Sequence, residues 1–104
     1  VYSSIPQDSS WHYLEQFYLR LEIIDLLKSG EKTVSELIQI VGIKQATLSQ
    51  HLAILREREI ITSRKEGMNT YYRLRKTEIV DACSIIRGIL KDLMIERHKM
   101  AKRL

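Results

Sequence analysis

The 104-residue sequence has one cysteine, Cys83, so neither an intrachain disulfide nor a zinc site built on cysteine pairs can form within one chain. No apolar run approaches the roughly 20 residues of a membrane-spanning helix, and the first residues lack the charged-then-apolar order of a signal peptide. Catalytic patterns are also missing: we find no phosphate-cradling glycine loop, no nucleophile with a base at a recognisable spacing and no carboxylate pair in a cleft-forming context. We therefore expect a soluble, cytoplasmic protein that is not an enzyme.

Positive charge is concentrated in one third of the chain. Residues 43–76 hold eight Lys/Arg and three Glu, a net charge of +5, whereas the other seventy residues sum to −1. A basic patch confined to one segment is the footprint expected for contact with phosphates. The length allows one domain with one modest core.

Residues 33–55 predict two short helices joined by a tight turn. Thr33 and Glu36 have the spacing of a capping box, so the first helix should begin at Val34. Gly42 should end it, because glycine enters the left-handed conformation without steric cost. The second helix should begin near Lys44, and the charged residues 56–59 should continue it. Two helices joined in this way are typical of a helix-turn-helix.

The second helix has an apolar stripe and a polar face. Leu48, Leu52 and Leu55, with Ala53 beside them, form the predicted buried stripe. The opposite face is rich in hydroxyl and amide groups near the helix N-terminus, where base edges and phosphates are met in a major groove. A face that is merely solvated is the alternative. The candidate DNA-reading residues are Lys44, Gln45, Thr47, Ser49, Gln50 and His51.

Residues 60–66 and 69–74 predict a β-hairpin that turns at Gly67 and Met68. Tyr72 and Leu74 should face the core, and the polar residues should line the exposed side or the tip. Cations there could simply protect an edge strand from aggregation. Directly after a reading helix, the hairpin is better interpreted as a wing that contacts the DNA backbone or the minor groove. Its candidate contacts are Arg64, Lys65 and Asn69.

The two ends of the chain predict long helices that pair between subunits. Residues 11–28 are apolar around more than half of the helix circumference, so the helix needs covering on two sides. Residues 77–103 carry a heptad seam over a length of roughly 40 Å. The alternative for the first helix is a central core helix in a monomer, and the alternative for the last helix is packing on its own domain only. The candidate dimerisation residues are Trp11, Leu14, Tyr18, Ile79, Cys83, Ile86, Leu90 and Leu93.

The run T-L-S-x-H-L-x-x-L-R at residues 47–56, followed by E-G-x-x-x-Y-Y-R-L at residues 66–74, resembles the ArsR/SmtB-type winged helix-turn-helix repressors. The resemblance covers residues 12 to about 100. It implies a homodimer, built on the first and last helices, that binds a palindromic operator and represses transcription. It also implies that the candidate reading and wing residues named above occupy DNA-binding positions.

The sequence departs from the family at three places. Lys44 stands where a serine or similar cap is usual. Residues 35–40 contain no cysteine, so the metal-sensing motif of many members is absent. In a second family metal site on the last helix, Asp81 and Cys83 have the spacing of the first ligand pair, but Met94 and Arg97 hold the later positions. We therefore predict no metal and no cofactor, and we interpret Cys83 as an apolar seam residue, with a thiol switch as the alternative.

These observations predict a mainly α protein with a small β-hairpin: a winged helix-turn-helix with long N- and C-terminal dimerisation helices. We expect a flexible lead-in at residues 1–10, dimerisation helices at 11–28 and 77–103, a helix-turn-helix at 34–58 and a wing at 60–74. The predicted function is sequence-specific regulation of transcription. Its partners would be double-stranded DNA and a second copy of the chain, with no membrane. The alternative is a winged-helix module for protein–protein contact in a transcription assembly.

Overall fold

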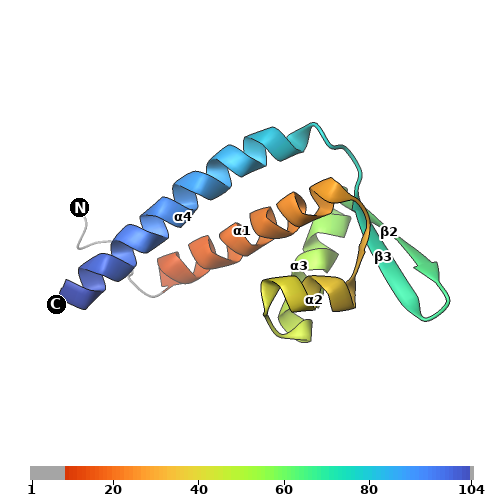
Figure 1. Cartoon of the computed structure of the whole chain (residues 1–104), viewed down its shortest axis with the longest axis horizontal. Helices are drawn as coiled ribbons and strands as arrows, with labels where there is room; N and C mark the ends of the chain where they lie inside the picture. Colours follow the sequence, from red (N-terminus) through yellow and green to blue (C-terminus); the bar gives the residue numbers. More distant parts are fainter. Residues whose placement is uncertain (1–8, 104) are drawn as a thin grey trace.

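Four α-helices and a small antiparallel sheet form an elongated molecule (Figure 1). The structure, a computed structural model, describes the backbone of residues 9–103 and the side chains of residues 12–100. The helices are α1 (Ser9–Leu26), α2 (Val34–Val41), α3 (Gln45–Glu57) and α4 (Ile79–Arg103), and a 3-10 turn, η2 (Leu27–Ser29), extends α1. The predicted fold class is confirmed. Residues 1–8 of the predicted lead-in lie outside the described residues.

The helix-turn-helix forms where local signals predicted it. Thr33 Oγ1 accepts a hydrogen bond from the Glu36 amide at 3.2 Å, and a Glu36 carboxylate oxygen accepts one from the Thr33 amide at 3.1 Å, which completes the capping box. Gly42 ends α2 in the left-handed conformation, with φ of 73°, and its amide donates to the Ile38 carbonyl at 2.8 Å. The capping box therefore fixes the start of α2, and Gly42 fixes its end and the turn that leads into α3.

The sheet has one strand more than predicted. β2 (Ile61–Glu66) and β3 (Asn69–Leu74) are the predicted hairpin, and β1 (Lys32–Thr33) pairs with the other edge of β3, so the strand order is β1-β3-β2. The register sets Lys32 opposite Tyr72 and Thr33 opposite Tyr71. A strand of two residues has no periodicity of its own, so no sequence pattern predicts β1. Strand β1 thus connects the hairpin to the start of α2.

The end of α3 differs from the prediction that residues 56–59 continue the helix. The helix ends at Glu57, and Glu59 adopts a left-handed conformation with φ of 62°. The Ile60 amide donates to the Leu55 carbonyl at 2.9 Å and the Glu59 amide to the Arg56 carbonyl at 3.0 Å, the pattern of a Schellman motif. Glycine usually holds this position, so the sequence lacked the usual signal for a helix end.

The core lies where α1, α2, α3 and the sheet meet, and it extends along α4. Ile23 of α1 is fully buried. The predicted core positions Leu48, Leu52 and Leu74 are confirmed, and Tyr72 packs against the core. The buried apolar residues are Leu21, Ile23, Ile24, Leu27, Leu37, Leu48, Leu52, Leu55, Ile61, Leu74, Val80, Cys83 and Leu90.

Candidate nucleic-acid interface

Helix α3 presents one continuous exposed face, which we call the reading face. Of the candidate reading residues, Lys44, Gln45, Ser49 and Gln50 are exposed and Thr47 is half-buried. Ala53 is also exposed, so the prediction that it joins the buried stripe is wrong. The reading face therefore combines amide, hydroxyl and ammonium groups with a small side chain.

The N-terminus of α3 is open. Lys44 is the N-cap residue in extended conformation, and its side chain makes no capping hydrogen bond. The first amide groups of a helix carry partial positive charge and favour an anion such as a phosphate. Lys44 in place of a serine cap adds a positive charge at this end.

His51 does not belong to the reading face. Its side chain is only 2% exposed, and its Nδ1 accepts a hydrogen bond at 3.2 Å from Nε of Arg20 in α1. The prediction that His51 reads DNA is wrong, because position 51 falls on the buried side of α3 beside Leu48, Leu52 and Leu55. Polar character alone suggested exposure, and a partner 31 residues away satisfies the imidazole instead.

Burial controls the charge of His51. Because Nδ1 accepts the bond from Arg20, the imidazole is neutral with its proton on Nε2, which has no hydrogen-bond partner among the described residues. Burial lowers the pKa of His51, and the Arg20 cation lowers it further. His51 therefore connects α3 to α1 as an uncharged group.

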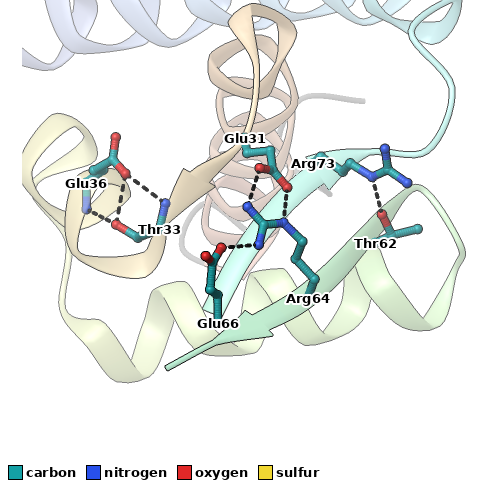
Figure 2. Close-up of polar contacts among 7 residues, drawn as sticks. All are labelled: Glu31, Thr33, Glu36, Thr62, Arg64, Glu66 and Arg73. Atoms are coloured by element: carbon teal, nitrogen blue, oxygen red, sulfur yellow. Dashed lines mark hydrogen bonds and ion pairs between the residues drawn. The ribbon is translucent and has the colours of Figure 1, made fainter. Parts of the chain in front are cut away.

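The wing has a polar face and a core-facing side. Side chains alternate along a strand, so Arg64, Tyr71 and Arg73 share the face turned away from the core residues Ile61 and Leu74. Arg73 donates to Thr62 Oγ1 at 3.2 Å on the same polar face (Figure 2). Two wing candidates lie near the tip: Lys65 and Asn69 are exposed on either side of the turn.

The third wing candidate, Arg64, already has protein partners. Glu31, in the loop before β1, accepts two hydrogen bonds from its guanidinium at 2.8 Å, and Glu66 accepts a third (Figure 2). The bonded Arg64 lowers the pKa of Glu31, while Glu31 and Glu66 raise the pKa of Arg64. Nothing in the sequence pointed to Glu31, since it is a single carboxylate in a loop 33 residues before Arg64.

Helices α1 and α4 lie side by side and form an arm on the side of the molecule away from the wing (Figure 1). The predicted heptad seam of α4 is divided between two faces of this helix. Cys83 and Leu90 are buried in the chain's own core, so the prediction that they face a partner subunit is wrong. Ile86 and Leu93 point outward, and Arg87 pairs with Asp25 of α1 at 3.3 Å.

The other dimerisation candidates occupy intermediate positions. Leu14, Tyr18 and Ile79 are partly buried and pack against the core of the same chain. The side chain of Trp11 lies outside the described residues. The apolar side chains that remain exposed on the arm are Tyr13, Phe17, Ile85, Ile86, Ile89, Leu93, Ile95 and Met100.

The residues considered for a metal site do not converge. Asp81 is exposed and Cys83 is buried in the core, and no cluster of three or more His, Cys, Asp or Glu that could hold a metal occurs in the described part of the chain. Burial raises the pKa of the Cys83 thiol and so disfavours the thiolate that a thiol switch would need. Among the described helices, none is long and apolar enough to cross a membrane.

Comparison with known proteins places this geometry among bacterial regulators. Residues 19–63 match the family described as bacterial regulatory protein, arsR family. The transcriptional repressor SdpR of Bacillus subtilis is 35% identical over 63 residues, which are 61% of this chain and 70% of SdpR. The arsenical resistance operon repressor of Staphylococcus aureus is 39% identical over 62 residues, 60% of each chain. The chain thus spans less than two thirds of this second relative.

A solved structure supports the same assignment over more of the chain. The transcriptional regulator HlyU of Vibrio vulnificus superposes with a TM-score of 0.59 at 31% sequence identity, covering 80% of this chain and 91% of HlyU. The match therefore extends beyond the helix-turn-helix, and the predicted resemblance is confirmed.

Proposed function

This chain belongs to the ArsR family of bacterial transcription regulators, and on that premise we propose that it represses transcription as a homodimer bound to a palindromic operator. One domain carries both activities: the helix-turn-helix and wing contact DNA, and the arm of α1 and α4 joins two subunits. The observation that carries this proposal is the reading face, a polar exposed helix face that begins at an open N-terminus and has a wing beside it.

Each part of the surface has a separate role in DNA binding. Lys44 lies where a phosphate is favoured, at the N-terminus of α3. The amide side chains of Gln45 and Gln50 are suited to adenine edges in the major groove. In the wing, Lys65 contacts the sugar-phosphate backbone. The proposed contacts are Lys44, Gln45, Thr47, Ser49 and Gln50 in α3, with Lys65 and Asn69 in the wing.

The exposed apolar residues of the arm support the dimer. Ile85 is 67% and Ile89 57% exposed, and they share an outward face of α4 with Leu93. A row of exposed branched apolar side chains on one helix is unusual for a monomer and is typical of a subunit interface. A dimer formed through the arm leaves both reading faces free, which a palindromic site with half-sites about 34 Å apart requires.

Selection of bound duplexes from a random pool tests sequence recognition. We expect an enriched palindrome, and binding to it that weakens steeply with salt, because Lys and Arg release counterions from phosphates. Changing Gln45 and Gln50 together to Ala should reduce the preference for the palindrome over random duplex by about tenfold or more, at about 1–3 kcal/mol per lost base contact. Equal binding to palindrome and random duplex would favour a protein-interaction module instead. A reporter gene fused to the enriched site tests repression, and increased expression would refute it.

Sedimentation tests the dimer. Changing Ile89 to Lys places a charge on the proposed interface and should convert the dimer to a monomer. Changing Ile40 of α2 to Lys is the matched control, because Ile40 is also an exposed isoleucine but lies outside the arm. A wild-type protein that sediments as a monomer at working concentration would refute the dimer.

A further inference from the structure

Arg64 lies at the centre of a four-residue cluster on the polar face of the sheet, and Figure 2 shows its bonds to Glu31 and Glu66. Its Nε and Nη2 donate to the two carboxylate oxygens of Glu31, each at 2.8 Å, and its Nη1 donates to Glu66. The guanidinium carbon lies 4.5 Å from the centre of the Tyr71 ring. All three guanidinium nitrogens are therefore engaged, and the geometry with Glu31 is the bidentate one that makes Arg–carboxylate pairs strong and directional.

This cluster spans the whole width of the sheet. Arg64 is on β2 at one edge, Tyr71 is opposite it on the central strand β3, and Glu31 comes directly before β1 at the other edge. The Arg64 side chain thus crosses Tyr71 to reach Glu31. Because β1 pairs with β3 through two residues only, the bidentate bond from Arg64 to Glu31 adds a second connection between the start of β1 and the hairpin.

The far end of this link is the start of the helix-turn-helix. Thr33, two residues after Glu31, is the N-cap of α2 and pairs with Tyr71 across the sheet. A bond that fixes Glu31 to the wing therefore also fixes the angle between the wing and α2. Since only three residues separate α2 from α3, the angle between the wing and the reading face depends on the same bond.

Charge argues against Arg64 as a phosphate contact. Two carboxylates surround one guanidinium, so the cluster has a net charge of −1, and a phosphate would have to displace a bidentate partner to reach Arg64. The exposed Lys65 next to it has neither obstacle.

We propose that Arg64 is a positioning residue and Glu31 its anchor, and that the pair holds the wing at the angle at which Lys65 and the reading face contact one DNA duplex together. The proposal rests on the proposed function, because it assigns a role within DNA binding. It replaces the sequence prediction that Arg64 itself contacts DNA.

Whether Glu31→Gln tightens or weakens DNA binding distinguishes a phosphate contact at Arg64 from a positioning role. If Arg64 contacted a phosphate, Glu31 would compete with the DNA, and Glu31→Gln would tighten binding. If Glu31 anchors the wing, Glu31→Gln weakens binding by roughly three- to tenfold, although it removes a negative charge from a DNA-binding protein. Glu57→Gln at the end of α3 is the matched control for the charge, because Glu57 is exposed and makes none of the described ion pairs.

The experiment measures affinity for the selected duplex at four salt concentrations for Glu31→Gln, Arg64→Gln, the double variant, Lys65→Gln and Glu57→Gln. We expect Glu31→Gln and Arg64→Gln both to weaken binding, and the double variant to be no weaker than Arg64→Gln, because the Arg64–Glu31 link is lost in all three variants and Arg64→Gln also loses the bond to Glu66. The salt slope should fall by about 0.9 for Lys65→Gln, the value for one phosphate contact, and should stay unchanged for Arg64→Gln. Binding by Glu31→Gln that is tighter than by Glu57→Gln, or a reduced slope for Arg64→Gln, would overturn the proposal.

Hydrogen exchange measured on the free protein tests the Glu31–Arg64 anchor without DNA, so its result does not depend on the proposed function. Loss of the anchor should speed exchange of the β1–β3 amides to the same extent in Glu31→Gln, Arg64→Gln and the double variant, and not in Glu57→Gln. Unchanged exchange would overturn the proposal even if the wild type binds DNA. Absence of any wild-type binding to duplex would instead refute the proposed function, and the proposal with it.

Discussion

Mild acid should destabilise this protein through His51. The imidazole is 2% exposed and accepts a bond from the Arg20 guanidinium, so protonation would remove the acceptor lone pair on Nδ1 and leave a second cation in a buried position beside Arg20. Burial first, and then Arg20, lower the pKa of His51 from its ordinary value of 6.5. The unfolded chain therefore binds this proton more tightly than the folded chain.

The sign and the upper limit of the effect follow from this difference. Above pH 6.5 both states are neutral at position 51 and His51 adds no pH dependence. As the pH falls below 6.5 the unfolded state gains a proton first, so the free energy of unfolding decreases until the folded-state pKa is reached. One proton limits the slope to about 1.4 kcal/mol per pH unit, so the loss at pH 5.5 relative to pH 7.5 is at most about 1.4 kcal/mol.

Urea unfolding followed by circular dichroism at pH 7.5 and 5.5, at one fixed protein concentration, measures this loss. His51→Gln is the matched variant, because its amide oxygen can accept the bond from Arg20 but does not titrate. Wild type should lose more stability than His51→Gln, and the difference between the two losses is the contribution of His51. The hydrogen bond from Arg64 lowers the pKa of Glu31 from its ordinary value of 4.5. Protonation of Glu31 therefore changes the free energy of unfolding only at lower pH. Equal losses, or an imidazole that titrates at or above pH 6.5 by NMR, would refute the reasoning.

Three further substitutions test the local structure by their effect on urea unfolding. Thr33→Ala removes the N-cap of α2 and should lower the free energy of unfolding by about 1 kcal/mol, whereas Thr33→Ser keeps the hydroxyl cap and should lose much less. Glu59→Gly removes the steric strain of a non-glycine residue in the left-handed conformation and should stabilise the protein by about 1 kcal/mol. A loss of stability would mean that the Glu59–Arg75 ion pair at 3.3 Å contributes more than this strain costs. Leu48→Ala empties a fully buried site and should cost about 2–5 kcal/mol, so a loss below 1 kcal/mol would contradict its place in the core.

The helix-turn-helix and the hairpin could be predicted because their signals act over a few residues. Thr33 caps α2 through Glu36, three residues away, and Gly42 ends the same helix by its own backbone freedom. The turn at Gly67 and Met68 likewise joins two strands that are adjacent in the chain. Such interactions survive in any tertiary context that allows the element to form. The end of α3 escaped prediction because Glu59 holds a position where glycine is the usual signal.

The exposed part of the reading face was predicted from the leucine spacing, which fixes the opposite side of α3 as buried. The same argument misplaced residues at the edges of the stripe: Ala53 is exposed and His51 is buried. On α4 the apolar repeat was read as one seam, but the packing of α1 divides it, burying Cys83 and leaving Ile86 outside.

The sequence by itself therefore determined the four helices and the hairpin, and where the positive charge gathers, but not strand β1 or the end of α3. Tertiary structure alone decided what each polar side chain does. His51 meets Arg20 across 31 residues and is buried, and Arg64 meets Glu31 across 33 residues in an ion pair on the surface of the sheet. The physical reason is that caps and turns are made by near neighbours, whereas the burial and pairing of a side chain depend on the elements that pack against it, which no local pattern reports.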